Sequence, residues 1–458
     1  MPDHLFRGSL AELDPESDEL SRIEAERQAR KLILIPSESA APLAVRQALA
    51  SVFQNIYAEG YPDDETRLLG QDDILDYEAR LIHYRRYSDP RYYKGVEYAD
   101  TAEALARRRC AELFAANGFS ADDLFVNVQA LSGAPANNAA YHALIQPGDV
   151  ILGMDLLHGG HLSHGSPANR SGRLYKAFHY GIDPETERID YGAVEALARE
   201  HRPKVIIAGY SSYPWMPDWR KFREIADAVG ATLLADIAHI AGMVAAGVVP
   251  SPIGIADVVS FTTHKSLCGP RGAVLLTTSR KLSRSIDRAV FPGEQGGPHV
   301  NTMLAQAVAF RLARTAAFRT LQQGIVRNCI ALTRRLQDRG LRIPFGGTET
   351  HMTNVDCSSV RAPDGTPLSG DQAARILAWP GSSSIATRSP VTGRPPSLPA
   401  FAWGRRGSPS AGSMSLRPSN WPTLSPTCFW VVGPTGRRCA RGRRCGRRSS
   451  SHCSIRSA

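Results

Sequence analysis

The segment Val258-Val-Ser-Phe-Thr-Thr-His-Lys-Ser-Leu-Cys-Gly-Pro-Arg271 decides the fold of this chain. Its first residues are apolar and β-branched, so we expect residues 257–261 to form a buried strand. Hydroxyl side chains, His264 and Lys265 follow, and Gly269-Pro270 closes the segment with a turn. A lysine just past a buried strand can act as a nucleophile, because partial desolvation near a pocket lowers the pKa of its amine. Most lysines are solvated, so this segment alone leaves a surface lysine in a loop as the alternative.

Outward from this segment, helical and strand patterns alternate along the chain. Short apolar runs predict strands at 124–128, 150–154, 204–208 and 232–235. Amphipathic runs predict helices at 101–117, 136–146, 190–200 and 219–230. This alternation is typical of an α/β domain with a mostly parallel sheet.

Chemically active residues follow the predicted strands, at the points where the strands end. Ligands of such sheets gather where strands end in loops, so these side chains are expected to converge. They are Ser132, Gly133, His161, Ser211, Asp236, His239 and Lys265. This convergence favours a functional Lys265 over a solvated one.

The predicted set matches the needs of pyridoxal phosphate. A lysine amine can form a Schiff base with its aldehyde, and an aspartate such as Asp236 can keep its ring nitrogen protonated. Ser132-Gly133 precedes a predicted helix, whose first N–H groups can bind a phosphate, and His161 can stack on the ring. Each residue also has an ordinary reading: Asp236 as a helix cap, His161 as a loop histidine, and Ser132-Gly133 as a plain turn. Their order on successive strand ends favours cofactor binding.

The remaining elements suggest a division of the chain into five parts. We expect an N-terminal arm and active-site loop (1–62), a helical insertion (63–90), a large cofactor-binding domain (91–320), a partial small α+β domain (321–378) and a tail (379–458). The arm contains a predicted helix at 16–33, which packs on a partner subunit or lies on the surface. The insertion has Ile74, Tyr77, Leu81 and Tyr84 on one predicted helical face. The small domain has predicted helices at 305–317 and 324–340, strands at 342–345 and 352–357, and a last helix capped by Ser369.

The net charge of +10 would suggest a nucleic-acid or membrane partner, but the excess lies in the tail. Residues 379–458 contain thirteen Arg and no Lys, Asp or Glu, which leaves 41 Lys and Arg against 44 Asp and Glu in residues 1–378. Four cysteines lie scattered in the body without metal-ligand spacing, as in a reduced protein. The sequence has no secretory h-region and no apolar run long enough for a membrane span. We therefore expect a cytoplasmic protein with neither a nucleic-acid nor a membrane partner.

Six long motifs in this order resemble serine hydroxymethyltransferase, a fold-type I pyridoxal-phosphate enzyme, over roughly residues 20–378. They are Tyr57-Ala-Glu-Gly-Tyr-Pro62, Arg91-Tyr-Tyr93, Leu157-His-Gly-Gly-His-Leu-Ser-His-Gly165, Asp236-Ile-Ala-His-Ile-Ala-Gly242, Thr262-Thr-His-Lys-Ser-Leu-Cys-Gly-Pro-Arg-Gly272 and Phe291-Pro-Gly-Glu-Gln-Gly-Gly-Pro298. The family converts L-serine and tetrahydrofolate to glycine and methylenetetrahydrofolate. The resemblance implies the same fold, cofactor and reaction here, with no metal.

The resemblance implies a role for each strand-end residue. Lys265 forms the Schiff base with the cofactor, Asp236 pairs with its ring nitrogen, and His161 stacks on its ring. The residues implied near the phenolate oxygen and the phosphate are Ser211, His239, Ser132, Gly133 and, from the loop 291–298, Gly297. His264, beside the lysine, is implied to be catalytic.

A second group of residues implies a homo-oligomer, either a dimer or a tetramer. Glu59, Tyr57, Tyr93 and Gly297 would enter the site of the partner subunit, where Glu59 would manage the proton at the serine hydroxyl and at folate. The residues implied at the substrate are Ser37 and Arg271, and those at the pteridine of tetrahydrofolate are Tyr92, Leu156, Gly160 and Leu162.

Three departures from the family pattern affect these expectations. The 28 residues 63–90 stand where the family usually has about two, which predicts a helical excursion on the surface. Ala134-Pro135 replaces the usual polar pair after Ser132-Gly133, which should weaken phosphate binding by about 1 kcal/mol. After Ala378, the family segment with a carboxylate-binding arginine has no counterpart in this sequence. Its loss removes a bidentate contact with the substrate, so we expect impaired or absent turnover.

The tail leaves two alternatives open. A reading-frame shift near Ala378 would explain both the lost segment and the absence of acidic residues and lysines. A genuine basic tail that binds RNA or an anionic surface is the other possibility. Two further function classes also stay open: a related aldolase, such as a threonine aldolase, and a non-catalytic member of the family.

Overall fold

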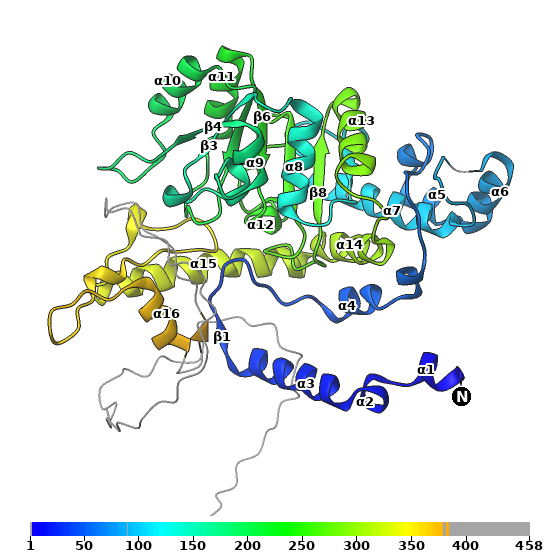
Figure 1. Cartoon of the computed structure of the whole chain (residues 1–458), viewed down its shortest axis with the longest axis horizontal. Coiled ribbons are helices and arrows are strands. Elements are labelled where there is room, and N and C mark those ends of the chain that lie inside the picture. The colour runs from blue at the N-terminus through cyan, green and yellow to red at the C-terminus, as the bar shows by residue number, and fades with distance from the viewer. Residues whose placement is uncertain (1, 89, 379–381, 384–458) are drawn as a thin grey trace, which may run out of the picture.

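The structure is a computed structural model that describes residues 2–88, 90–378 and 382–383, and the tail expected at 379–458 otherwise lies outside it. Its centre is a seven-stranded sheet in the order β2-β8-β7-β6-β5-β3-β4 (Figure 1). Only β8 runs antiparallel to its neighbours, so the prediction of a mostly parallel α/β sheet is confirmed. The strands are β2 (Phe125–Asn127), β3 (Val150–Met154), β4 (Lys176–Tyr180), β5 (Val205–Gly209), β6 (Thr232–Asp236), β7 (Val258–Thr262) and β8 (Ala273–Thr277).

Helices cover both faces of this sheet, and the sequence of β5 shows why. Val205 and Ile207 pack into one core with α8 (Gly133–Leu144) and α13 (Arg280–Arg288). Ile206 and Ala208 point the other way, into the core formed with α7 (Glu97–Phe114), α10 (Tyr191–His201), α11 (Trp219–Val229) and α12 (Ala241–Ala245). Side chains alternate between the faces of a strand, so a continuous apolar run is what a sheet covered on both faces requires.

The five expected strands of the large domain and its four expected helices are all present, with ends shifted by up to four residues. The sequence prediction missed β4 and β8. β4 is the edge strand beside β3 and carries polar residues, including Lys176 and His179. β8 returns antiparallel from the Gly269-Pro270 turn and pairs with β7, for example Phe261 with Val274.

The segment after the sheet differs from the prediction in two ways. The two helices are longer and closer together, α14 (Val300–Ala313) and α15 (Ala316–Asp338), and break at Arg314-Thr315. The strands predicted at 342–345 and 352–357 are wrong: this stretch makes only an isolated bridge between Arg342 and Asp356, and Pro344 begins a 3₁₀ turn that ends the extended run. The Ser369 cap is confirmed, since Ser369 Oγ accepts from Gln372 N at 3.2 Å at the start of α16 (Gly370–Ala378). The domain division at residue 320 falls inside α15 and stays a prediction.

The N-terminal arm runs along the lower side of the body in Figure 1. It comprises α1 (Pro2–Arg7), α2 (Leu10–Leu13) and α3 (Pro15–Arg30), followed by β1 (Leu32–Ile33), which pairs with β9 (Ser382–Ser383). The predicted helix therefore ends three residues early. Its apolar side chains are exposed in the single chain, including Phe6, Leu20 and Ile23.

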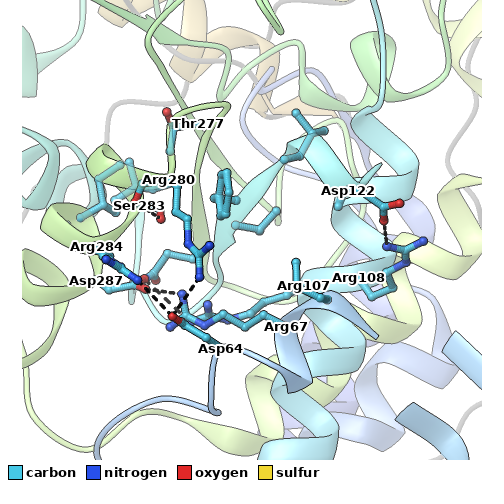
Figure 2. Close-up of a pocket in the computed structure, with 18 of the residues that line it drawn as sticks. Asp64, Arg67, Arg107, Arg108, Asp122, Thr277, Arg280, Ser283, Arg284 and Asp287 are labelled. Atoms are coloured by element: carbon cyan, nitrogen blue, oxygen red, sulfur yellow. Dashed lines mark hydrogen bonds and ion pairs between the residues drawn. The ribbon is translucent and has the colours of Figure 1, made fainter. Parts of the chain in front are cut away.

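The insertion is a surface excursion of short helices, as expected, but not one continuous helix. α5 (Gln71–Leu75) and α6 (Tyr77–Tyr87) are separated at Asp76, whose carboxylate caps α6. The single apolar face predicted here is wrong, because Ile74 is buried against the body whereas Tyr77 is exposed. Figure 2 shows Asp64 and Arg67, from the start of the insertion, beside Arg280 and Arg284 of α13. No helix in the described part of the chain is long and apolar enough to cross a membrane.

Candidate active site

Lys265 lies three residues past the end of β7 with only 9% of its surface exposed. Within the described residues, its amine has no hydrogen-bond or ion-pair partner. Burial lowers the pKa of Lys265, the charge of Arg271 lowers it further, and Asp236 opposes both effects. An amine of this kind is more often neutral than a solvated lysine and therefore more nucleophilic.

Asp236 ends β6 and is held by donors from three other elements. Its Oδ2 accepts from Asn137 Nδ2 at 2.8 Å and lies 3.0 Å from His164 Nε2, and its Oδ1 accepts from Ala238 N at 3.0 Å. Burial alone would raise the pKa of Asp236, but the hydrogen bond from His164, with that from Asn137, outweighs burial and holds the pKa well below its usual range. A buried carboxylate that stays ionised can pair with a protonated ring nitrogen.

Asn137 and His164 are functional candidates that the sequence reasoning missed. Asn137 lies on the first turns of α8, and Ser260 Oγ donates to its amide oxygen at 2.7 Å. This bond fixes the amide so that its NH₂ faces Asp236. His164 is the last of three histidines in the motif 158–164, and only the second, His161, is a predicted site residue. Spacing within that motif was the only available signal for His164.

His161 and His239 both lie close enough to Lys265 for its charge to lower their pKa values. Burial, together with the neighbouring His164, lowers the pKa of His161 to about 4, so the ring is neutral near pH 7. Burial and the nearby Lys265 charge also lower the pKa of His239. Ser211 Oγ lies 3.4 Å from His239 Nε2, while His239 Nδ1 is buried without a hydrogen-bond partner. A free nitrogen here is available to a ligand.

Ser132 is the N-cap residue of α8, yet its hydroxyl makes no capping bond. Pro135 has no N–H and Ala136 N already donates to Ser132 O, so among the described residues the N–H groups of Gly133 and Ala134 and the Ser132 hydroxyl remain available to an anion. Gly133 is required because a Cβ there would lie 2.8 Å from Thr262 Cγ2, at the end of β7. The predicted phosphate turn thus lies directly beside the strand that leads to Lys265.

A second group of predicted residues comes together on a separate loop surface. Tyr57 and Tyr93 pack edge to face at 5.1 Å, and both are exposed in the single chain. A Cβ on Gly297 would lie 2.7 Å from Tyr57 Cζ, and one on Gly296 would lie 3.1 Å from Glu59 Oε1. Among the described residues, no hydrogen bond joins this group to Lys265, and the role of these residues in a partner's site stays a prediction.

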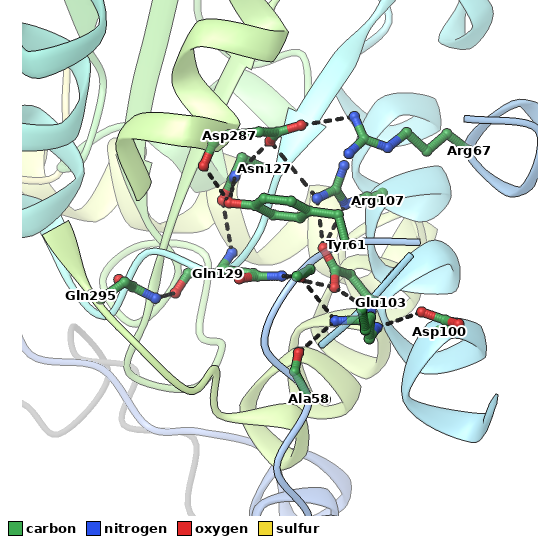
Figure 3. Close-up of polar contacts among 12 residues, drawn as sticks. Ala58, Tyr61, Arg67, Asp100, Glu103, Arg107, Asn127, Gln129, Asp287 and Gln295 are labelled. Atoms are coloured by element: carbon green, nitrogen blue, oxygen red, sulfur yellow. Dashed lines mark hydrogen bonds and ion pairs between the residues drawn. The ribbon is translucent and has the colours of Figure 1, made fainter. Parts of the chain in front are cut away.

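The loop that carries Glu59 is clamped from behind by a buried ionic network (Figure 3). Arg91 Nη1 donates to Ala58 O at 2.8 Å and to Gly60 O at 3.0 Å, on both sides of Glu59. Glu103, which is fully buried, accepts from Arg91 Nη2 at 2.7 Å and from Arg107 Nη2 at 2.5 Å. This network fixes the backbone of the loop and leaves the Glu59 side chain half-buried.

The residues predicted to contact substrate and folate are mostly accessible. Leu156 and Leu162 are each 46% exposed and Tyr92 is 70% exposed, whereas Gly160 is buried against the backbone of Met154. Ser37 is half-buried and Arg271 is exposed. These predictions of contact stay predictions.

Two more histidines border the site. Burial, with the charge of Arg271, lowers the pKa of His264 to about 4. Burial also lowers the pKa of His351 to about 4, and its ring stacks on His239 with centroids 5.6 Å apart. His351 lies just before the stretch 352–357 that the sequence predicts as a strand, and no sequence pattern indicates that it reaches the site. No set of three or more potential metal ligands lies together in the described residues.

Comparison with known proteins yields consistent matches. The family model for serine hydroxymethyltransferase matches residues 10–87 and 83–378, in two pieces that meet within the insertion. The chain is 42% identical to a serine hydroxymethyltransferase of Synechococcus sp. over 93% of this chain and 92% of that protein. It is 46% identical to one of Cyanothece sp. over 77% of this chain and 75% of that protein, and 47% identical to one of Myxococcus xanthus over 76% and 75%. The family model ends at 378, while the Synechococcus match extends into the tail, since residues 1–378 make up less than 93% of the chain.

Proposed function

The chain belongs to the serine hydroxymethyltransferase family, and on this premise we propose that the Lys265 site interconverts L-serine and tetrahydrofolate with glycine and 5,10-methylenetetrahydrofolate. The observation that carries the proposal is the buried, unpaired amine of Lys265 with an ionised, buried Asp236 nearby. These are the two protein groups that pyridoxal 5'-phosphate chemistry requires.

The residues around Lys265 fit pyridoxal phosphate. Ser132 and the first N–H groups of α8 would hold its phosphate, and His239 Nδ1, which lacks a partner, would face a polar group of the ligand. When bound, the cofactor withdraws electrons from the Cα of an attached amino acid. Asp236 would keep a proton on the ring nitrogen, and Asn137 and His164 would keep Asp236 ionised and correctly oriented.

Lys265 would bind the aldehyde through its amine, and its lowered pKa favours the neutral form needed for that. His161, neutral near pH 7, would stack on the ring without adding a positive charge beside it. His264 would lie next to the reacting lysine. The burial of these side chains and their lowered pKa values support these proposed roles.

Glu59 would act in the site of a second copy of the chain. The clamp formed by Arg91 presents Glu59 at a loop whose tyrosines are exposed in the single chain. The exposed apolar side chains of the N-terminal arm also suit burial against another subunit. We therefore propose a homo-oligomer in which Glu59 moves the proton at the serine hydroxyl.

We further propose that turnover is impaired, because no counterpart of the family's carboxylate-binding arginine follows Ala378 in the sequence. A lost bidentate arginine–carboxylate contact costs about 3 kcal/mol, or roughly a hundredfold in kcat/KM. The frame-shift hypothesis for the tail is tested by the nucleotide sequence. It fails if the alternative frames downstream of codon 378 do not encode that segment.

The cofactor experiment is a titration of the purified chain with pyridoxal phosphate, followed by visible absorbance. The visible absorbance band of the lysine-bound cofactor should be present in the wild type and in Lys281→Ala, which replaces an exposed lysine as a control. The same band should be absent in Lys265→Ala. Serine cleavage is then measured with and without tetrahydrofolate. Dependence on folate supports the proposal, cleavage without folate indicates a threonine aldolase-like activity, and an equal band in Lys265→Ala would refute the assignment of the lysine.

A further inference from the structure

A cleft separate from the Lys265 site opens between the insertion and the β2 edge of the sheet (Figure 2). The cleft has a volume of about 90 Å³ that is accessible to water. Its walls come from the start of the insertion, from α7, from β2 and β8, and from α13. None of its lining residues belongs to the proposed active site, so its function is not explained by the proposed reaction.

Arginine dominates the polar lining of this cleft, which we call the arginine cleft. The lining carries five arginines and three aspartates: Arg67, Arg107, Arg108, Arg280, Arg284, Asp64, Asp122 and Asp287. The inner arginines have carboxylates of their own; Arg67 pairs with Asp287 at 2.8 Å, for example. The unbalanced positive charge of the arginine cleft therefore lies at its mouth.

At the mouth, two guanidinium groups share a single carboxylate. Arg280 and Arg284, four residues apart on α13, each place Nη2 3.3 Å from Oδ2 of Asp64. Both side chains are more than half exposed, so neither is held in place by packing. Two guanidinium groups with one shared carboxylate oxygen leave one positive charge unbalanced, and most of their N–H donors have no partner in the part of the chain that the structure describes.

The deeper wall adds another free donor and an apolar floor. Arg67 Nε is buried and has no hydrogen-bond partner in the described part of the chain. The side chains of Leu124, Val126 and Ile286, each almost fully buried, line the cleft, and the exposed Leu68 lines it from the insertion. A ligand that satisfies both parts must combine an anionic group with an apolar body.

We propose that the arginine cleft binds an organic phosphate, with the phosphate between Arg280 and Arg284 and the organic part on the apolar floor. A phosphate dianion offers three acceptor oxygens and matches the forked geometry of two guanidiniums better than a single carboxylate oxygen does. In the free protein, the Asp64 carboxylate binds Arg280 and Arg284, and the phosphate displaces it from both arginines on binding. Because Asp64, Arg67 and Leu68 all belong to the insertion, the insertion builds one wall of the site.

The test is calorimetric titration of the full chain at constant ionic strength, after the Lys265 site has been loaded with pyridoxal phosphate and unbound cofactor has been removed by gel filtration. The probes are phenyl phosphate and inorganic phosphate. The double variant Arg280→Gln/Arg284→Gln should bind phenyl phosphate at least about tenfold more weakly than the wild type. The matched control Arg199→Gln/Arg335→Gln removes two arginines of equal exposure elsewhere, and should change the affinity less than about twofold.

Asp64→Asn gives a test with the opposite sign. Removing the internal carboxylate frees both guanidiniums, so phenyl phosphate should bind at least about threefold more tightly. Unchanged affinity in the Arg280/Arg284 variant, an equal loss in the control, or weaker binding to Asp64→Asn would each overturn the site. Inorganic phosphate binding as tightly as phenyl phosphate would overturn the organic-phosphate assignment.

Discussion

Substitution of Glu103 by Gln should destabilise the protein more than any exposed charge substitution. Glu103 is a carboxylate shared directly by Arg91 and Arg107. Its side chain is fully buried and also accepts from Gln129 Nε2 at 2.9 Å. The pKa of Glu103 lies below its usual value despite burial, because the two guanidiniums outweigh desolvation.

The expected loss in the free energy of unfolding follows from the contacts that Arg91 and Arg107 keep after Glu103→Gln. Gln keeps the volume but loses the charge, and its NH₂ group faces guanidinium donors. Arg91 retains Asp100 at 2.5 Å, whereas the nearest remaining carboxylate oxygen to Arg107 is that of Asp287, at 3.9 Å. Breaking a buried ion pair from one side costs about 3–5 kcal/mol, a large part of the 5–15 kcal/mol typical of a folded domain.

Urea unfolding measured by circular dichroism tests this, with Glu195→Gln as the matched control. Glu195 pairs with Arg199 on an exposed helix face, and its loss should cost less than about 0.5 kcal/mol. The activity of the folded Glu103→Gln protein should also fall, because Arg91 no longer holds both carbonyl groups beside Glu59 rigidly.

A double variant separates the ionic effect from a general packing defect. Adding Arg107→Met to Glu103→Gln removes the cation that was left unpaired, so part of the lost stability should return. A loss below about 1 kcal/mol in Glu103→Gln, or further destabilisation in the double variant, would refute the assignment of the network as an ionic clamp.

Three further outcomes are expected. Asn137→Ala removes the donor that lies 2.8 Å from Asp236, and should weaken pyridoxal phosphate binding about tenfold in a fluorescence titration; unchanged binding would contradict the role of Asn137. The cofactor-free protein should lose stability as the pH falls from 6.5 to about 4, because the pKa of His161 is lowered in the folded state and protons then bind the unfolded chain first. One such group changes the free energy of unfolding by about 1.4 kcal/mol per pH unit within this window. The urea midpoint of His161→Asn should therefore depend less on pH than that of the wild type. An equal dependence of the two midpoints on pH would argue against a lowered pKa of His161. Tyr61→Phe removes the hydrogen bond from the phenol to Asp287 O at 2.6 Å and should cost about 1 kcal/mol in urea unfolding, a prediction that an unaltered midpoint would contradict.

Local sequence patterns were sufficient to predict a sheet covered by helices on both faces and the strand-end residues proposed to bind the cofactor. Continuous apolar runs such as the one ending at Phe261 identify strands covered on both faces, because their side chains alternate between the two cores. Short segments with mixed character were read wrongly. The polar edge strand at 176–180 was missed, and the segments around Arg342 and Met352 were predicted as strands although turns interrupt them.

The sequence by itself determined that Lys265, Asp236 and Ser132 stand at strand ends, and a parallel sheet brings such ends to one edge whatever the details of packing. Only the tertiary structure decided which donors hold Asp236, since Asn137 lies 99 residues away along the chain. It alone placed Arg280 beside Asp64, which is separated from it by 216 residues. Hydrogen bonds and charge pairs act over a few ångströms in space, and no local periodicity records which distant side chains will meet at that distance.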